Sequence, residues 1–422
     1  LNFRICSSSH ISWKQKLRRS WGRLDMKSEW KTYTVQELID LGMLEAPMDG
    51  NHGNLHPKVS DYVLEGIPFI MANDLVNGKI DYKKCAHITE AQARQLKKGF
   101  AHPGDVLLTH KATIGRTALV ENEYDTIVLT PQITYYRVKK GISNRYLKAY
   151  FDSKEFQELL SNWAGSGSTR AYLGITAQRK LPILLPSIDI QNKIASYCES
   201  IDGKITVNSM INDNLSDLLQ TIYQGQFGKV GLANNCGILA DICSYSKDKI
   251  EISKLSLDTY YSTENMLPEK SGAVKATSLP TTSQTTACHK GDTLISNIRP
   301  YFKKIVYCED DCGCSTDVLC FKPVHPRYTA YLFSTLYADS FFDFMVAGAK
   351  GTKMPRGDKQ QIMTYPVVLP SEKDLSEFNS VATPILTQIY SNRTESERLS
   401  AIRDTLLPKL ILGEIDVSSI QL

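Results

Sequence analysis

Two loops place cations and amides after matching strands of the chain. The first spans residues 110–116 and the second spans 297–304, and each follows a Gly-Asp turn and a short apolar strand. Arg and Lys neutralise phosphates, while Arg, Lys, Asn and Gln pair with base edges. The loops therefore predict contacts with nucleic acid, with solvated turns as the plainer alternative. The candidate residues are His110, Lys111, Thr113 and Arg116 in the first loop, and Asn297, Arg299, Lys303 and Lys304 in the second.

A second pair of loops combines glycine with cations, at residues 165–170 and 350–356. Glycine lets backbone amides approach a phosphate closely, and a neighbouring cation adds charge. The alternative is a flexible connector. A polar turn near residue 52 also has the residue types that read bases, although such turns are common for purely local reasons. The candidates are Thr169, Arg170, Thr352, Lys353 and Arg356 in the loops, and Asn51, His52 and Asn54 in the turn.

These candidates recur because one unit is written twice in the chain. Self-similarity at a fixed interval indicates repeated structural units, and the interval here drifts only as short loop insertions would require. Gly104-Asp105 recurs as Gly291-Asp292 at an interval of 187, Tyr146-Leu147 as Tyr331-Leu332 at 185, Thr169-Arg170 as Thr352-Lys353 at 183, and Leu181 to Ser187 as Tyr365 to Ser371 at 184. Each copy ends in an apolar strand that leads into a long helical pattern.

The two helical patterns have apolar residues at seven-residue spacing and polar residues in the middle. Asn208 and Asn392 fall on the same repeat position. A buried Asn at such a seam costs stability and fixes register, whereas the alternative is a solvated gap. Lys204, Gln388 and Glu395 lie in the same layer and are expected to satisfy the amides. A helix over 187–226 would be about 60 Å long.

The predicted fold class is α/β (α+β), with two globular domains that are each followed by a long helix, the helices forming an antiparallel coiled coil. Short alternating strands at 127–138 and 317–322 support the mixed class. The expected boundaries are an N-terminal extension outside the fold at 1–25, domain 1 at 26–186, a central spacer helix at 187–227, domain 2 at 228–370, a C-terminal spacer helix at 371–413 and a tail at 414–422.

The chain resembles the specificity subunit of type I restriction-modification systems from Met26 to its C-terminus. The stretches that carry the resemblance are 49–57 (DGNHGNLHP), 66–70 (GIPFI), 104–116 (GDVLLTHKATIGR), 262–268 (STENMLP) and 291–304 (GDTLISNIRPYFKK). One departure is Ala112, where related loops commonly have Gly, so the backbone there is expected to be less permissive.

The resemblance implies two target-recognition domains that each read half of a bipartite site on double-stranded DNA. The paired helices would hold the domains apart. The implied partners are two methyltransferase (M) subunits and, through the complex, nuclease/translocase (R) subunits. On this interpretation the chain is a DNA-recognition subunit, and it has no catalytic residues of its own.

Composition sets wider limits. A net charge of +4 allows a polyanionic partner only through a local patch, and no apolar run approaches the roughly 18 residues that span a bilayer. Without the apolar core of a secretory signal, the protein is expected to be cytoplasmic. Residues 1–25 are basic, and an arm that grips DNA is the alternative to an extension outside the fold. Cys308, Cys312 and Cys314 have a spacing that allows a metal, but without a CxxC pair we expect a crowded hairpin and no metal.

Motifs for catalysis are missing from the sequence. It has no Walker-type phosphate loop, no Asn-Pro-Pro-Tyr/Phe run and no Gly-rich turn placed for a methyl donor, so we expect no cofactor. Two rival hypotheses remain, a fused restriction-modification enzyme and a coiled-coil scaffold whose globular ends bind protein. Methyl transfer by the chain alone would indicate the first, and weak salt dependence of DNA binding would indicate the second.

Overall fold

A computed structural model describes residues 30–53, 55–165, 171–228 and 235–415. The chain divides into two compact units, residues 1–205 with 398–422, and residues 206–397. The division runs through both long helices, so each unit contains one globular part and one segment of each helix. The extension at 1–25 and the tail from residue 416 lie outside the described residues. Among the described helices, none is long and apolar enough to cross a membrane.

The first unit contains two four-stranded sheets, ordered β2-β11-β8-β9 and β6-β3-β10-β7, and a two-stranded sheet in which β1 pairs with β12. Within the second sheet, β10 pairs parallel with β3 and antiparallel with β7. Its strands are β1 (Lys31–Thr34), β2 (Met48–Asp49), β3 (Ile67–Ile70), β4 (Leu75–Val76), β5 (Lys79–Ile80), β6 (Ala86–Ile88), β7 (Phe100–Ala101), β8 (Val106–Lys111), β9 (Thr113–Leu119), β10 (Ile127–Leu129), β11 (Ile133–Tyr136) and β12 (Pro182–Leu185). Its shorter helices are α2 (Val35–Asp40), α3 (Glu90–Ala93), α4 (Asn144–Asp152), α5 (Lys154–Trp163) and α6 (Ile175–Gln178).

The second unit repeats this plan. Its sheets are ordered β14-β21-β18-β19 and β15-β17-β20-β16, and β13 pairs with β22. As β10 does, β20 has one parallel and one antiparallel neighbour. Its strands are β13 (Cys236–Ile238), β14 (Cys243–Tyr245), β15 (Lys249–Glu251), β16 (Tyr260–Tyr261), β17 (Gln284–Cys288), β18 (Thr293–Ser296), β19 (Ile305–Tyr307), β20 (Cys312–Cys314), β21 (Val318–Pro323) and β22 (Pro366–Val368). Its shorter helices are α8 (Thr329–Tyr337), α9 (Asp339–Ala347) and α10 (Lys359–Ile362).

The outer strand of the second sheet differs between the units. In the first unit β6 lies beside β3, whereas in the second unit β15 lies beside β17, at the opposite place in the strand order. The part that the two units share is therefore the first sheet, β2-β11-β8-β9 or β14-β21-β18-β19, with its helices. The strand order begins to differ in the second sheet.

In each unit the central strand, β8 or β18, is an inner strand of the first sheet and is buried on both faces. In β8, Val106 and Leu108 pack in the cluster that contains α4 and α5, while Leu107 packs with the second sheet. In β18, Ile295 and Leu294 divide between two clusters in the same way. Because side chains alternate across a strand, a strand covered on both faces reads as a continuous apolar run.

Two of the repeated sequence pairs have the same structural role in both units. The hydroxyl of Tyr146 donates to the carbonyl oxygen of Leu184 at 2.7 Å, and the hydroxyl of Tyr331 donates to that of Val368 at 2.5 Å. Each bond ties a helix to the closing strand and satisfies a buried hydroxyl. The Gly-Asp pairs form equivalent turns, because Gly104 and Gly291 both have φ of +93°, which favours glycine.

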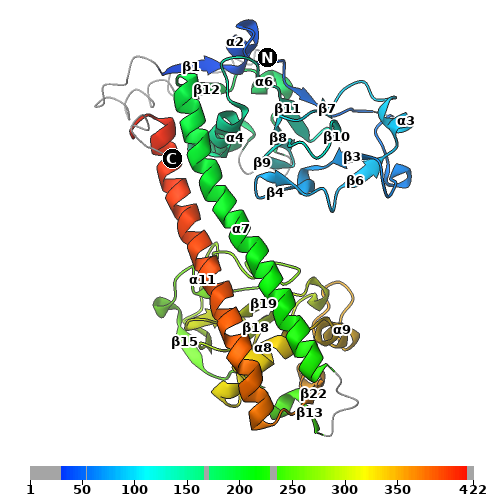
Figure 1. Ribbon diagram of the computed structural model, residues 1–422, viewed down its shortest axis with the longest axis vertical. Coiled ribbons are helices and arrows are strands. Elements are labelled where there is room, and N and C mark those ends of the chain that lie inside the picture. The colour runs from blue at the N-terminus through cyan, green and yellow to red at the C-terminus, as the bar shows by residue number, and fades with distance from the viewer. Residues whose placement is uncertain (1–29, 54, 166–170, 229–234, 416–422) are drawn as a thin grey trace, which may run out of the picture. The chain divides into compact units, whose positions relative to one another are not determined.

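The long helices are α7 (Ile188–Phe227) and α11 (Glu372–Ile411), each 40 residues long and continuous in Figure 1. In the first unit Arg403 donates to Asp202 at 2.6 Å. In the second unit Asn208 pairs with residues near 392–396, whereas Asn212 pairs with the carbonyl of Ile389. Partner numbers fall as numbers on α7 rise, so the helices are antiparallel. The predicted fold class is confirmed.

The two repeated asparagines lie together in the second unit and are both buried. The Asn208 amide donates to Glu395 at 2.8 Å and to the backbone carbonyl of Asn392 at 3.3 Å. The Asn392 side chain donates to Asn212 at 2.9 Å and accepts from Gln388 at 2.7 Å. Gln388 and Glu395 thus contact the amides as the sequence suggested, whereas the side-chain oxygen of Asn208 has no hydrogen-bond partner among the described residues.

Replacing Asn392 with Ala is expected to lower the free energy of unfolding by about 1–3 kcal/mol, because it removes two hydrogen bonds of a buried side chain, one accepted from Gln388 and one donated to the half-buried Asn212. Urea unfolding of the full chain measures this. Asn214→Ala is the matched control, since Asn214 lies exposed on α7, and it should change stability by less than about 0.5 kcal/mol. Equal effects of the two changes would contradict a structural role for the layer.

Candidate nucleic-acid interface

Three segments of the first unit meet at the end of β8. The amide of His110 donates to the carbonyl of Gln132 at 2.9 Å, which joins the end of β8 to the turn before β11. The amide of Ala112 donates to Ala171 at 3.1 Å, and the amide of Leu173 donates back to His110 at 2.9 Å. The first predicted loop is therefore fixed between two other segments by backbone hydrogen bonds.

The second unit builds the same junction at the end of β18. The amide of Asn297 donates to the carbonyl of Asp317 at 2.8 Å. The amide of Arg299 donates to Pro355 at 2.8 Å, and the amide of Gly357 donates back to Asn297 at 3.2 Å. The structure therefore brings the loops 297–304 and 350–356 together, and the bonding pattern is that of the first unit.

Residue for residue, this junction equates Ala112 with Arg299, at the interval of 187 that relates the Gly-Asp turns. Both residues adopt the left-handed conformation, with φ of +63° and +50°. That conformation is unfavourable for residues with a Cβ atom, which explains why glycine suits the position. Ala112 therefore adopts the left-handed conformation although it has a Cβ atom where related loops commonly have glycine.

Around Asp49, the first unit gathers several of the predicted residues. The carboxylate of Asp49 accepts from His52 Nε2 at 2.7 Å and from Lys98. Burial raises the pKa of Asp49, but hydrogen bonds from Lys98 and then His52 outweigh it, so the pKa lies below its ordinary value. Asn51 is buried and its amide donates to the His52 carbonyl at 3.2 Å, which makes it part of the turn rather than an exposed reader.

An open hollow of about 380 Å³ lies beside this group and is lined by His52, Lys111 and Gln132, among others. His110 is fully buried beneath the loop, where its Nδ1 contacts the Leu173 carbonyl at 3.1 Å and its Nε2 has no hydrogen-bond partner among the described residues. Burial lowers the pKa of His110 and favours the neutral imidazole. Lys111 and His52 are exposed, so among the predicted residues they are the cation and the ring that face the hollow.

The remaining candidates of the first unit have mixed surroundings. Thr113 is half-buried at the start of β9. Arg116 is exposed, but its guanidinium donates to the carbonyls of Ala72 and Leu75 at 3.2 and 3.4 Å and so supports the segment before β4. Asn54, Thr169 and Arg170 lie outside the described residues.

In the second unit, two of the predicted lysines are already engaged. Lys303 Nζ pairs with Asp339 at 2.7 Å, and this hydrogen bond raises the pKa of Lys303. Lys304 Nζ donates to the carbonyl of Thr263 at 2.6 Å, and burial lowers its pKa. Both lysines hold the loop in place. Asn297 is buried, and its side-chain oxygen has no hydrogen-bond partner among the described residues.

The cations that face solvent lie on the neighbouring loop. Thr352 and Lys353 are exposed. Arg356 is also exposed, and its Nε and Nη2 donate to Asp317 Oδ1 at 3.3 and 3.2 Å. Arg299 is half-buried, and its buried Nε has no hydrogen-bond partner within the part of the chain that the structure describes.

Residue types alone did not point to three members of the junction, Gln132, Tyr172 and Asp317. Tyr172 forms a backbone bridge with Lys111, and Arg356 forms the equivalent bridge with Ile298 in the second unit. Tyr172 is 53% exposed. The spacing of the repeat is a signal that could have found them, because Gln132 and Asp317 are 185 residues apart and Tyr172 and Arg356 are 184 apart. Matching residue types could not find them, because their side chains differ between the units.

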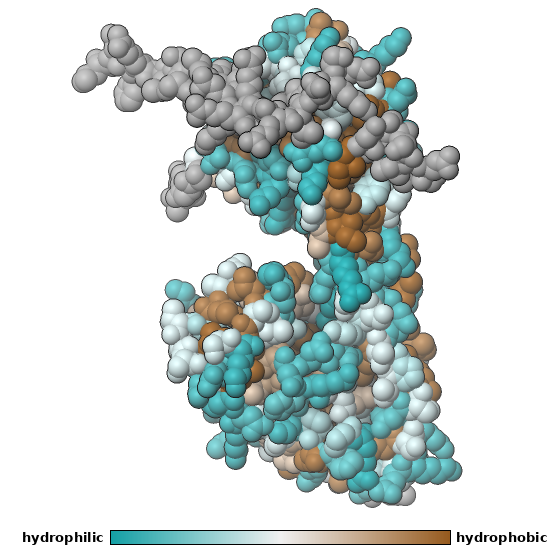
Figure 2. Space-filling view, turned by 90° about the vertical axis from the view of Figure 1, so that its left-hand side faces the viewer, coloured by the Kyte–Doolittle hydropathy of each residue, from teal (hydrophilic) through white to brown (hydrophobic). Residues whose placement is uncertain are grey.

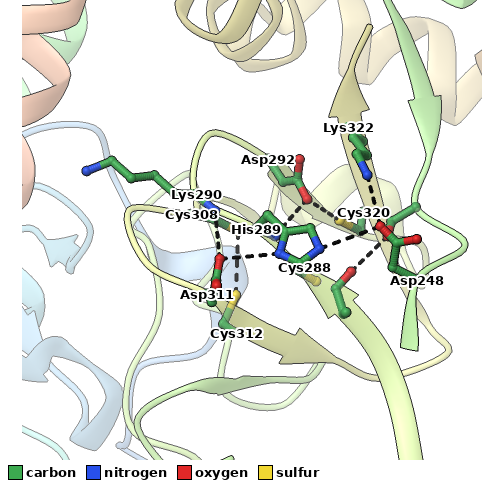
Figure 3. Close-up of polar contacts among 12 residues, drawn as sticks. Asp248, Cys288, His289, Lys290, Asp292, Cys308, Asp311, Cys312, Cys320 and Lys322 are labelled. Carbon is green, nitrogen blue, oxygen red and sulfur yellow. Dashed lines mark hydrogen bonds and ion pairs between the residues drawn. The ribbon is translucent and has the colours of Figure 1, made fainter. Parts of the chain in front are cut away.

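The cysteine-rich hairpin of the second unit is a packed core. Cys308 and Cys312 have their sulfur atoms 3.6 Å apart, and Cys320 contacts Asp292 at 3.4 Å (Figure 3). The bond with Cys312, followed by burial, holds the pKa of the Cys308 thiol well above its ordinary value. Within the described ranges, no group of three or more His, Cys, Asp or Glu side chains is arranged to hold a metal ion.

Comparisons with known proteins define the class. Residues 27–216 match the family described as the type I restriction modification DNA specificity domain. The chain is 23% identical over 423 residues to the type I restriction enzyme MjaIX specificity subunit of Methanocaldococcus jannaschii, covering 92% of this chain and 95% of that one. It is 22% identical over 203 residues to the HindI specificity subunit of Haemophilus influenzae, covering 47% and 41%.

Among solved structures, the S subunit of a type I restriction-modification system from M. genitalium covers 92% of this chain and 98% of its own, at 15% identity and a TM-score of 0.49. The resemblance predicted from the sequence is confirmed by the family match and by the curated relatives. Residues 27–216 therefore match the type I restriction modification DNA specificity domain, and the chain is similar over 92% of its length to a type I specificity subunit.

Proposed function

We propose that this chain is the sequence-specific DNA-binding subunit of a type I restriction-modification complex. Each domain reads one half of a bipartite site on double-stranded DNA, and the predicted domains are 26–186 and 228–370. One observation carries the proposal, which is that the same three-segment junction is built twice with different side chains. A shared backbone with unlike side chains suits two readers of unlike half-sites, because backbone geometry positions a protein on DNA while side chains discriminate bases.

The long helices have two roles in this proposal. They set the spacing between the two half-sites of the DNA target. They also dock the methyltransferase subunits, two per complex, and the nuclease/translocase subunits join through these. Large apolar side chains that are 39–60% exposed lie on α7 within the second unit, and they suit a protein partner. They are Val207, Met210, Ile211 and Leu218. Figure 2 shows one face of the molecule, on which hydrophobic residues reach the surface among hydrophilic ones.

In this proposal the partner subunits supply the catalytic residues, and the chain alone is expected to transfer no methyl group. The candidate DNA contacts keep their predicted roles where they face solvent, as His52, Lys111 and Lys353 do. Asn51, Lys303 and Lys304 contribute by shaping the loops that carry the other contacts.

Binding of the full chain to duplex DNA should fall steeply with salt. Each phosphate contact contributes a slope of about −0.9 to a plot of log K against log salt concentration. Lys353→Ala is expected to reduce the slope by about one, because it removes an exposed cation beside the junction. Fluorescence anisotropy across a salt series measures both quantities.

The matched control for this titration is Lys373→Ala, which removes a cation that is 83% exposed at the start of α11 and should leave the slope unchanged. A wild-type slope near zero would favour the rival hypothesis, a coiled-coil scaffold that binds protein.

A further inference from the structure

Two side-chain positions in each unit lie at the junction and differ between the units in chemistry as well as in size. Gln132 in the first unit occupies the place of Asp317 in the second, because each accepts the amide hydrogen bond at the end of the central strand. Tyr172 occupies the place of Arg356, because each forms the backbone bridge to the loop. The backbone at these positions is held in common, so the side chains alone distinguish the two junctions.

In the second unit the two side chains form a pair with a free edge. Asp317 Oδ1 accepts from Nε and from Nη2 of Arg356, which uses one side of the guanidinium. Arg carries five N–H groups in a planar fork. Among the described residues no other group bonds to this guanidinium, so Nη1 and the second hydrogen of Nη2 remain for a ligand. A carboxylate that holds one side of the fork restricts the directions in which the other can point. Arg356 is 52% exposed at its side chain, so the free edge is accessible.

In the first unit Gln132 lines the open hollow with Lys111 and His52. Among the described residues, no protein group forms a hydrogen bond with its side-chain amide. Tyr172 is 53% exposed, and its ring lies 5.7 Å from that of His110. An amide with both a donor and an acceptor free among the described residues differs in recognition chemistry from an Arg-Asp pair.

We propose that these two positions determine the base specificity of each domain, an inference that rests on the proposed function. Arg356, positioned by Asp317, pairs with a guanine through its free edge, since Arg binds the O6 and N7 atoms of guanine in the major groove. Gln132 pairs with an adenine, since the amide matches N6 and N7 of that base. Tyr172 closes the first junction as an apolar and aromatic contact, and Asp317 is a positioning residue.

The test uses the full chain together with its methyltransferase partners and a library of duplexes with randomised sequence, selected by binding and then sequenced. Arg356→Gln is expected to lower the preference for guanine at one position of one half-site by roughly 5- to 150-fold, the range for one bidentate contact. Asp317→Ala should relax the same position, and Asp317→Asn, which retains an acceptor, should restore part of the preference. Gln132→Ala should relax an adenine position in the other half-site.

Transfer of the second unit's pair into the first unit is a gain-of-function test. Gln132→Asp combined with Tyr172→Arg should introduce a guanine preference into the first half-site and leave the second unchanged. Arg356→Lys separates base reading from a phosphate contact, because Lys keeps the charge without the planar fork. If Arg356→Lys and Arg356→Gln leave the selected motif intact and change only the overall affinity and salt slope, Arg356 contacts phosphate and the inference is overturned.

The wild-type selection distinguishes this inference from the function on which it rests. A wild-type complex that enriches no motif contradicts sequence-specific recognition as a whole. If the wild-type complex enriches a bipartite motif and substitution at all four positions leaves that motif unchanged, the proposed function stands and only the assignment of these specificity residues is wrong.

Discussion

Inserting four residues into both α7 and α11 is expected to lengthen the unread gap of the DNA target by about two base pairs and leave both half-sites unchanged. Four helical residues add about 6 Å, and one base step along a strand spans about 3.4 Å. The insertions belong between Asp202 and Asn208 in α7 and between Glu395 and Arg403 in α11, because the contacts on either side define matching intervals of the antiparallel helices. Methylome sequencing of a host that carries the variant with its partners measures the gap.

Insertion into α7 alone is the control, since it shifts the seam that the Asn208 layer fixes and should weaken recognition instead of lengthening the gap. An unchanged gap with both helices lengthened would remove the helices from any role in spacing.

Arg299→Ala and Arg116→Ala are expected to impair different half-sites. Arg299 lies in the loop after β18 with its Nε unpaired, so truncation removes that loop's half-buried guanidinium. Arg116 supports the carbonyls of Ala72 and Leu75, so truncation both loosens that segment and removes a cation from the first domain. Each change should cost roughly 1–3 kcal/mol of discrimination, confined to one half of the site. Site-resolved methylation profiling reports the two halves separately.

The conservative variants Arg299→Lys and Arg116→Lys retain the charge and should lose less affinity than the alanine variants while still relaxing geometry-dependent discrimination. Equal damage to both half-sites by either alanine variant would mean that the two loops are not separate readers.

Much of the fold followed from patterns that are local in the chain. The interval of 187 between the Gly-Asp turns and the recurrence of Tyr146 at Tyr331 predicted two equivalent units, and the structure gives each pair the same hydrogen bonds. The heptad spacing predicted the long helices, because amphipathic periodicity is set by the geometry of one helix. It also aligned Asn208 with Asn392, which lie in one buried layer.

The candidate site was harder to predict because its members meet only through tertiary contacts. Gln132 lies 22 residues beyond His110 and Tyr172 lies a further 40 away, yet all three belong to one junction. Residue type also misled in the other direction. Lys304 has the chemistry of a phosphate contact, but the fold directs its amine to a carbonyl oxygen.

The sequence by itself therefore determined the duplicated plan, the long helices and the resemblance to type I specificity subunits, because periodicity and repeat spacing are properties of the chain before it folds. Only the tertiary structure decided which cations remain free. Lys303 and Arg356 look alike as candidates, but Asp339 pairs with the amine of the first, whereas Asp317 leaves one edge of the second open. That difference depends on side chains 36 and 39 residues distant, and no local pattern in the sequence records where they will lie.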